Sequence, residues 1–179
     1  MQQAAKPQMD VTTIRDLTDI FAKPQCYCLN ESPNSPYQNL FIGDTRLALR
    51  SDADEQLMLH LEFNETVKIH SLKFLAASNS SGQDVSSAPK VLKLFVNKPN
   101  IGFSEAEDCE STQTIELTEE DVTGDGLEVK LRFVKFQRVT SLSIFVQENF
   151  GDEESTALGM LNINGTPVLG TNVSELKKC

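Results

Sequence analysis

The chain has 179 residues, 39% of them hydrophobic, and a formal net charge of −10 at pH 7. This length suits one domain whose core is large enough to need neither a metal ion nor a disulfide framework. The negative charge argues against a nucleic-acid partner, because phosphate binding requires a clustered basic face. No apolar run reaches the length of a membrane-spanning helix, so we expect neither a membrane anchor nor a membrane partner.

The N-terminal region is expected to contain one short helix. Residues 1–10 are polar and aperiodic, which predicts a disordered leader ahead of a single domain over residues 11–169. A helix is then predicted from Thr12 until the helix-breaking pair Lys23-Pro24. The prediction rests on apolar residues at spacings of three and four, namely Ile14, Leu17, Ile20 and Phe21.

The rest of the chain predicts short strands separated by polar turns. Strict alternation over residues 57–63 indicates a half-buried strand, with Leu59 facing inward and His60 on its solvated side. The polar residues 64–66 predict a turn, so that residues 67–75 would complete a hairpin. Regularly spaced strands of this kind predict an all-β fold, an antiparallel β-sandwich or jelly roll. Further strands are expected at residues 91–96, 114–117, 129–133, 142–146 and 158–163.

The negative charge is concentrated in one stretch. Ten of the 26 acidic residues lie between Pro99 and Val129, where there is no Lys or Arg, which leaves 16 acidic against 16 basic residues elsewhere. A solvated loop and a docking surface for a basic partner both explain such a run. The next predicted strand carries Lys130 and Arg132 on one face, which we expect to neutralise part of the acid within the fold.

Two of the four cysteines raise the possibility of redox chemistry. Cys26 and Cys28 would serve a thiol redox module, which is the alternative function for this chain. Against it, residues two apart in an extended chain point in opposite directions, which disfavours a disulfide between them. The neighbouring Gln25 and Glu31 also fail to supply the electropositive setting that a reactive thiol needs. We therefore interpret Cys28 as a packing residue.

The sequence contains no recognisable metal or catalytic site. His60 and His70 are its two histidines, and without a close Cys or His pair they predict no zinc site and no cofactor. A nucleophile turn of the Gly-x-Ser-x-Gly type is also absent, so we expect no enzymatic activity. We interpret the acidic turns at residues 52–55 and 152–154 as solvated rather than calcium-binding. A secreted glycan-binding jelly roll is a further alternative, which the absence of Trp disfavours and occupied Asn-x-Ser/Thr sites would support.

Five blocks of sequence, in order along the chain, carry a family resemblance. The longest is FQRVTSLSIFVQEN at residues 136–149, which runs into the acidic turn FGDEEST. The others lie at residues 28–32, 51–57, 116–122 and 165–168. Together they resemble the PITH domain, the proteasome-interacting C-terminal half of thioredoxin-like proteins. The resemblance implies a jelly roll of the galactose-binding type.

The same resemblance implies a function. We expect a non-catalytic domain that docks a thioredoxin-like protein onto the regulatory particle of the 26S proteasome, in the cytoplasm and the nucleus. Disulfide reductase activity would belong to a thioredoxin domain, whose Cys-x-x-Cys pair this chain lacks. We expect a monomer, with residues 170–179 as a C-terminal tail. Turns of a rigid sandwich concentrate binding residues. The predicted partner-binding residues are Asp52, Asp54, Glu55, Glu119, Glu120, Asp121, Asn149, Asp152, Glu153 and Glu154.

Overall fold

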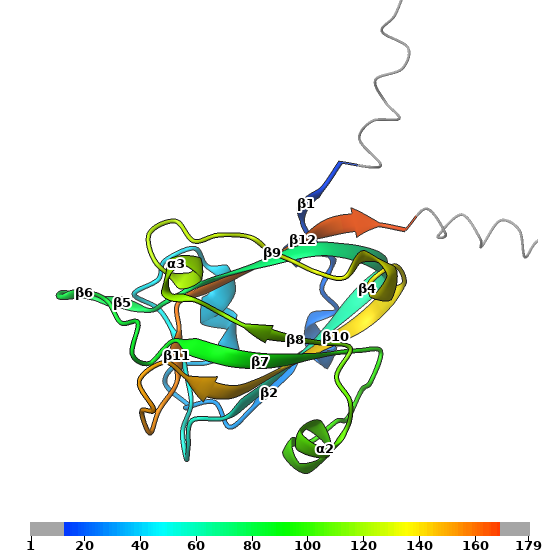
Figure 1. The fold of residues 1–179 in the computed structure, drawn as a ribbon. Coiled ribbons are helices and arrows are strands. Elements are labelled where there is room, and N and C mark those ends of the chain that lie inside the picture. The colour runs from blue at the N-terminus through cyan, green and yellow to red at the C-terminus, as the bar shows by residue number, and fades with distance from the viewer. Residues whose placement is uncertain (1–12, 169–179) are drawn as a thin grey trace, which may run out of the picture.

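Figure 1 shows the fold of the computed structural model, which describes residues 13–168. The predicted leader at residues 1–10 and tail at residues 170–179 therefore lie outside the described residues. The strands are β1 (Arg15–Asp16), β2 (Tyr27–Leu29), β3 (Leu49–Arg50), β4 (Leu57–Leu75), β5 (Ser78–Asn79), β6 (Gly82–Gln83), β7 (Pro89–Val96), β8 (Gln113–Glu116), β9 (Val129–Lys130), β10 (Val139–Asn149), β11 (Ala157–Leu158) and β12 (Met160–Pro167). The helices are the 3₁₀ helices η2 (Thr18–Ile20), η3 (Lys23–Gln25), η4 (Tyr37–Phe41) and η5 (Phe133–Lys135), and the α-helices α2 (Phe103–Asp108) and α3 (Glu119–Val122).

The strands form an antiparallel sandwich. The main strand order is β1-β12-β4-β10-β7-β8, and β2 and β9 each pair separately with β4. Two small sheets, β3 with β11 and β5 with β6, complete the structure. All of these pairings are antiparallel, which confirms the predicted all-β class.

β4 is a single strand of 19 residues that takes part in both layers. Residues 57–62 pair with β10, whereas residues 67–75 pair with β12. The predicted hairpin is therefore wrong, because residues 64–66 continue the strand. A tight two-residue hairpin turn requires positive φ angles, and none of these three residues has one. The β10 register shifts opposite this stretch, as expected where a long strand bends from one layer to the other.

The main core lies between the two layers. Leu57, Leu59 and Leu61 face into it, as their alternation predicts. Phe74 and Phe136 are among its largest side chains, with exposed fractions of 1% and 0%. Burying a side chain of this size stabilises the fold by about 1.5–3 kcal/mol.

A second cluster covers the opposite face of β4, β7 and β10. It consists of Met58, Phe95, Ile101, Ala106 and Phe145. Ala106 belongs to α2, so this helix shields the face that alternation alone would leave open. His60 has the same parity as Met58, and its side chain is only 2% exposed. The predicted solvated position of His60 is wrong, because the ring of Tyr27 stacks on it at a centroid distance of 4.9 Å.

The predicted N-terminal helix does not form in the described residues. Arg15 and Asp16 instead pair with β12 as strand β1, followed by the 3₁₀ helices η2 and η3. The Leu17 N–H donates to the Ile163 carbonyl at 2.9 Å, so tertiary pairing replaces an intrahelical bond. Leu17, Ile20 and Phe21 are nevertheless buried, as amphipathic spacing requires.

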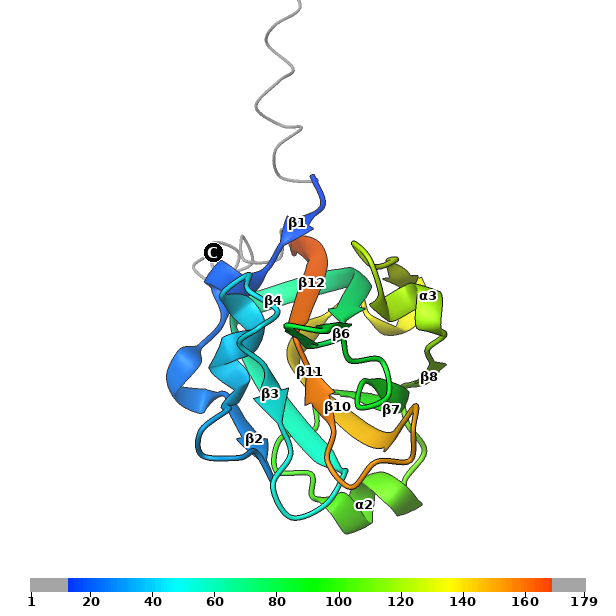
Figure 2. The same ribbon diagram turned by 90° about the vertical axis from the view of Figure 1, so that its left-hand side faces the viewer.

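Two short α-helices occupy parts of the acidic stretch. Residues 103–108 form α2 and residues 119–122 form α3, and neither helix was predicted from the sequence. Figures 1 and 2 show α2 at the bottom of the molecule and α3 well away from it. Within residues 13–168, no helix is long and apolar enough to span a membrane.

Candidate docking surface

Two acidic loops leave the same end of the sandwich. The first, residues 51–56, connects β3 to β4, and the second, residues 150–156, connects β10 to β11. β3 and β11 pair with each other, through Arg50 with Ala157 and Leu49 with Leu158. The start of the first loop therefore lies beside the end of the second, although the two are far apart in the sequence.

Thr156 joins the two loops. Its N–H donates to Ser51 Oγ at 2.8 Å, and its hydroxyl donates to the Glu55 carbonyl at 2.6 Å. The Ser51 N–H donates in return to the Thr156 carbonyl at 2.9 Å. Because Thr156 is fully buried, these hydrogen bonds are shielded from water, and losing one leaves a buried polar group without a partner.

Asn30 holds the first loop in place from the end of β2. Its amide donates to the Asp54 carboxylate at 2.9 Å and to the Gln56 carbonyl at 2.7 Å. Its side-chain oxygen accepts the Ala53 N–H at 3.0 Å. Asn30 has a φ of 71°, a left-handed conformation that Asn adopts more readily than most residues. Asn30 belongs to one of the five sequence blocks, but nothing in the sequence pairs it with residues 52–56.

Asn149 does the same for the second loop. It was predicted to contact a partner, but its side chain is only 5% exposed. Its amide donates to the Glu153 carbonyl at 3.0 Å and to Thr156 Oγ1 at 3.1 Å, and its oxygen accepts the Glu153 N–H at 2.8 Å. Between Asn149 and Glu153 in the sequence, Asp152 takes a left-handed φ of 54°, which suits Asp in a tight turn. Asn149 therefore positions the loop rather than presenting itself to a partner.

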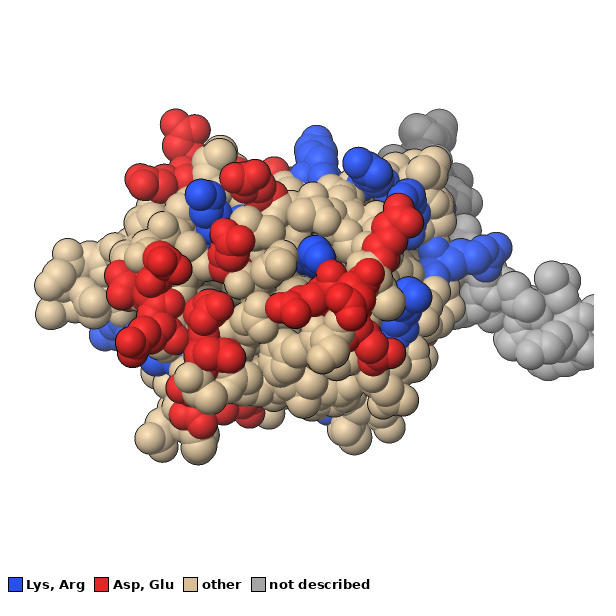
Figure 3. All heavy atoms as spheres, turned by 60° about the horizontal axis from the view of Figure 1, so that its bottom comes forward, with Lys and Arg blue, Asp and Glu red and all other residues tan. Residues whose placement is uncertain are grey.

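The carboxylates of both loops form one surface, which we call the paired acidic loops. Its members are Asp52, Asp54, Glu55, Asp152, Glu153 and Glu154, all exposed except the half-buried Glu55. Gln56 Nε2 donates to the Glu107 carboxylate at 3.2 Å, which connects this surface to α2. Figure 3 shows acidic side chains spread across the left and centre of the view, with basic ones mostly toward its top and right and a few among the acidic ones.

The six carboxylates differ in whether they accept hydrogen bonds within the fold. Asp54 Oδ1 accepts the Gln56 N–H at 3.0 Å in addition to the Asn30 amide, and Glu153 accepts a short hydrogen bond from the Ser86 hydroxyl. Within the described part of the chain, no side-chain hydrogen bond or ion pair engages the remaining four. These four, which are free to meet a partner, are Asp52, Glu55, Asp152 and Glu154.

The third predicted acidic group lies elsewhere, on α3. Asp121 caps this helix, because its Oδ2 accepts the Thr118 N–H at 2.8 Å. α3 is held against the end of β4, where the Ala76 N–H donates to the Val122 carbonyl at 2.9 Å. Glu119 and Glu120 are exposed there, separately from the paired acidic loops.

The two N-terminal thiols do not form a redox pair in this structure. Cys26 and Cys28 are both free and pack against the main core. Burial raises the pKa of both thiols above its usual value, and the Glu31 carboxylate adds to the rise at Cys28. The interpretation of Cys28 as a packing residue agrees with this geometry. Thiols held in the protonated form are poor nucleophiles.

A Ser-His-acid contact that sequence reasoning missed lies inside the fold. His60 Nδ1 is 2.9 Å from Ser143 Oγ, and His60 Nε2 is 2.9 Å from Glu62 Oε1. Ser143 has no exposed surface, so no substrate reaches its hydroxyl, and the contact satisfies buried polar groups. The cross-strand pairing of β4 with β10 creates it, and no local motif signals it. Across residues 13–168, no three His, Cys, Asp or Glu residues converge as metal ligands.

Comparisons with known proteins identify relatives over nearly the whole chain. The PITH domain family model matches residues 7–179. The chain is 36% identical over 176 residues to Thioredoxin-like protein 1 of Schizosaccharomyces pombe, covering 98% of this chain and 59% of that protein. It is 31% identical over 143 residues to PITH domain-containing protein 1 of Homo sapiens, covering 77% of this chain and 63% of that protein. The chain thus spans less than two thirds of the length of these relatives.

Solved structures resemble the fold at low sequence identity. CBM32-3 from a family 31 glycoside hydrolase of Clostridium perfringens matches with a TM-score of 0.58 and 14% identity, over 90% of this chain and 99% of that one. The family 32 CBM from C. perfringens NanJ, solved in complex with galactose, matches with a TM-score of 0.54 and 9% identity, over 85% and 99%. These likenesses confirm the β-sandwich of the galactose-binding type and concern the fold alone.

Proposed function

The chain belongs to the PITH domain family, and we propose that it is a non-catalytic docking domain for the regulatory particle of the 26S proteasome. In this proposal it attaches a thioredoxin-like protein to the particle, in the cytoplasm and the nucleus, and acts as a monomer without a cofactor. The name of its relative Thioredoxin-like protein 1 supports the thioredoxin connection. The chemistry would then reside in the attached thioredoxin.

One observation of the structure supports docking more than any other. Two acidic segments are clamped by buried hydrogen bonds of Asn149 and Thr156 into a single charged surface. A solvated loop without a role needs no such clamp, whereas a docking surface profits from one, because a rigid surface loses little entropy on binding. A basic patch on the regulatory particle is the complementary partner.

Charge of this kind acts mainly on the rate of association. Exposed carboxylates steer a basic partner during encounter, and salt screens that attraction. Because the four free carboxylates make no bonds in the fold, their neutralisation leaves the loops intact. The proposal therefore predicts a slower, less salt-dependent association with little change in complex lifetime.

The decisive experiment uses a charge-matched pair of variants. The test variant carries Asp52→Asn, Asp152→Asn and Glu154→Gln, whereas the control carries three neutralised acids near α3. The control substitutions are Glu119→Gln, Glu120→Gln and Asp125→Asn. Binding of purified regulatory particle to the immobilised domain is measured at about 50 and 300 mM salt. We expect the test variant to associate about 3–10-fold more slowly at low salt and the control to match the wild type.

Two results would count against the proposal. If the wild-type domain fails to capture proteasome subunits more than a charge-scrambled domain does, the chain is not a proteasome docking module. If the α3 control slows association and the test variant does not, docking occurs but through Glu119 and Glu120, which the sequence also singled out.

A further inference from the structure

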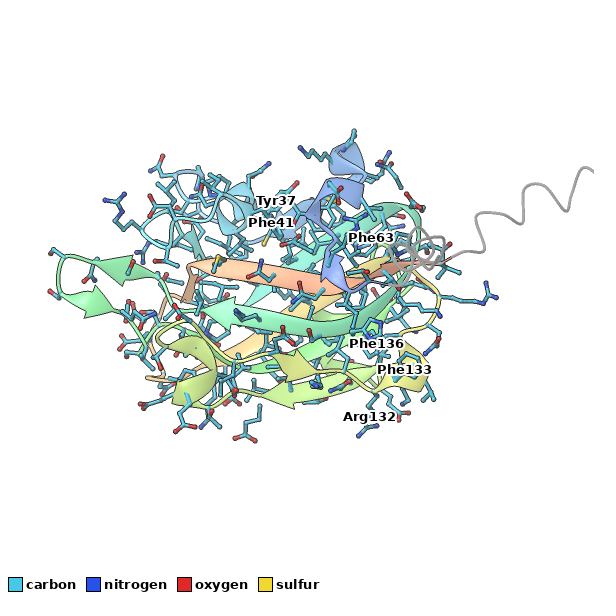
Figure 4. All side chains as sticks on the ribbon, turned by 90° about the horizontal axis from the view of Figure 1, so that it is seen from above. Tyr37, Phe41, Phe63, Arg132, Phe133 and Phe136 are labelled. Carbon is cyan, nitrogen blue, oxygen red and sulfur yellow. The ribbon has the colours of Figure 1, made fainter. Side chains whose placement is uncertain are left out.

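A second exposed surface, of opposite character, lies on η5. Phe133 is 53% exposed and Val134 is 80% exposed, which is unusual for large apolar side chains in a cluster. The sequence predicted a strand over residues 129–133, but β9 ends at Lys130 and Phe133 begins a 3₁₀ helix. Figure 4 shows Arg132 and Phe133 on the opposite side of the molecule from Tyr37 and Phe41.

The exposure is imposed by the fold rather than by a loose loop. The Leu131 N–H donates to the His70 carbonyl at 3.1 Å, and the Ile69 N–H donates to the Phe136 carbonyl at 3.0 Å. Leu131 and Phe136 are both buried, so the segment is fastened to β4 at each end. Gln137 Nε2 also donates to the carbonyl of Phe133 at 2.9 Å. Residues 132–135 are therefore held out from the sandwich in one conformation.

Two hollows of different chemistry flank this segment. An apolar hollow of about 220 Å³ lies among Ile14, Leu131 and Phe133. The centroid of the Phe133 ring lies 5.8 Å from the centroid of the His70 ring. A polar hollow of about 270 Å³ lies between the cations Arg132 and Lys135 and the chain that leads into β8. Ser111 and Thr112 of that chain and Thr114 of β8 line the hollow.

The charge around η5 is positive in a chain that is strongly negative. Residues 129–147 contain four basic residues and no acidic one, against a net charge of −10 for the whole chain. The four are Lys130, Arg132, Lys135 and Arg138, all exposed. In the described part of the chain none of them forms a salt bridge, so the expected neutralisation of the acidic stretch by Lys130 and Arg132 does not occur through ion pairs. Their charge remains available to a ligand.

We propose that the η5 surface, formed by residues 132–135 and the two hollows, binds an acidic peptide segment of a partner protein that carries a large apolar side chain. The apolar side chain enters the hollow beside Phe133, while neighbouring carboxylates meet Arg132 and Lys135. An aromatic anchor next to an arginine is the composition found where interfaces concentrate their binding energy. The surface is distinct from the paired acidic loops and does not depend on the proteasome as partner.

The charge distribution favours a peptide over a membrane or a nucleic acid. Glu128 lines the apolar hollow and Glu110 the polar one, and both would be repelled by a continuous layer of phosphates. The net charge of the chain opposes approach to any extended anionic surface. A short peptide places its few carboxylates at the cations and avoids those two acids.

The test selects the ligand from random sequence. A displayed library of random 12-residue peptides is selected on the full chain, after depletion on a Phe133→Ser variant. The affinity of each enriched peptide, synthesised with a dye label, is then measured by fluorescence anisotropy. We expect enriched peptides to combine aspartate or glutamate with leucine, phenylalanine or tryptophan. Phe133→Ser should weaken their binding about 10–30-fold, and Arg132→Gln with Lys135→Gln about 3–10-fold with a reduced salt dependence.

Matched controls separate this surface from the rest of the molecule. Ile42→Ser removes an apolar side chain that is 59% exposed on another part of the fold, and it should leave peptide affinity unchanged. The variant of Asp52, Asp152 and Glu154 should also bind the peptides as the wild type does. Val134→Ser repeats the test at an 80% exposed position, should Phe133→Ser prove poorly folded in a thermal melt.

Three outcomes overturn the proposal. The first is a selection that enriches no peptide, or enriches peptides without acidic residues. The second is binding that neither Phe133→Ser nor Val134→Ser weakens. The third is Phe133-dependent capture of the chain by vesicles of phosphatidylserine and phosphatidylcholine, which would make η5 a membrane-binding element instead.

Discussion

The paired acidic loops and the η5 surface are both held rigidly, but by different means. Buried polar residues clamp the acidic loops. Asn149 bonds to the backbone of the second loop, and Thr156 bonds to Ser51 and to the Glu55 carbonyl of the first. The η5 segment is fastened instead by the buried side chain of Phe136 and by hydrogen bonds to β4. The first arrangement presents solvated carboxylates, whereas the second presents Phe133 and Val134 beside unpaired cations. In each segment, the side chains that are not used for its own hydrogen bonds or packing remain exposed on the surface.

Under the two proposals, this difference assigns the surfaces separate roles in binding. Solvated charge accelerates encounter and contributes little to complex lifetime, because water and salt screen it. Exposed apolar groups beside cations slow dissociation, because burying them removes apolar area from water. A domain with both can use one surface for capture and the other for retention.

The largest effect should come from the anchor of η5. Phe136→Ala removes a fully buried ring from the main core, so we expect the free energy of unfolding to fall by about 3–5 kcal/mol. Phe133→Ala, three positions earlier and 53% exposed, should change it by less than about 0.5 kcal/mol. Urea denaturation of both variants measures the contrast. Equal losses would mean that Phe133 belongs to the core.

The polar clamp should contribute less than the apolar anchor. Asn149→Ala removes the acceptor of the Glu153 N–H and the donor to the Thr156 hydroxyl, which still donates to the Glu55 carbonyl. This should lower the free energy of unfolding by about 1–3 kcal/mol. Asn34→Ala, at an exposed position, is the control and should cost almost nothing. The same denaturation assay applies. A loss below about 0.5 kcal/mol for Asn149→Ala would show that the loop does not depend on this clamp.

Cys26 and Cys28, which pack against the main core, allow a test of the redox alternative. Burial raises the pKa of Cys28 above the 9.0 of an exposed thiol, so the folded protein keeps a proton that the unfolded chain releases in alkali. The resulting stabilisation is complete below pH 9 and is lost as the pH rises above it. Between pH 9 and 10 the Cys28 part of this loss should amount to about 1 kcal/mol, so Cys28→Ala should lose about that much less stability than the wild type over this range. The raised pKa of Cys26 leaves an alkaline slope in both proteins.

The control for this measurement is Cys109→Ala, which removes a thiol that is exposed rather than packed against the core. Thiol labelling across a redox titration complements it. A reversible two-electron couple at Cys26 and Cys28 would restore the redox alternative.

The smallest expected effect concerns the free carboxylates. Because Asp52, Asp152 and Glu154 make no side-chain bonds in the described structure, the triple neutralisation used for docking should shift the free energy of unfolding by less than about 0.5 kcal/mol. Thermal and urea unfolding against the wild type provide the check. A larger loss would show that these carboxylates support the loops, and slower docking could then no longer be assigned to charge.

The class of the fold could be predicted because strand periodicity is local. Leu57, Leu59 and Leu61 all face the main core, as alternation requires. The same pattern misplaced His60, because alternation assumes that one face of a strand meets water. In this fold Tyr27 and α2 cover that second face, and both come from distant parts of the sequence.

The path of the chain was harder to predict than its strands. Polar residues 64–66 indicated a turn, but polarity alone does not reverse a chain that lacks positive φ angles. The apolar Ile14 and Phe133 matched helix and strand spacings, yet each is more than half exposed. Pairing of β1 with β12, and of the η5 flanks with β4, decided both cases.

The sequence by itself determined the all-β class, the family and the composition of the acidic segments, because each of these depends on neighbouring residues or ordered blocks. Only the tertiary structure decided that Thr156 joins the loop of residues 51–56 to the loop of residues 150–156 while α3 stays apart. It also decided that Asn149 is a clamp and that Phe133 faces solvent. The physical reason is that the junction of the two loops and the exposure of Phe133 depend on hydrogen bonds between segments that are distant in sequence, and the Asn149 clamp depends on the path of the turn after β10.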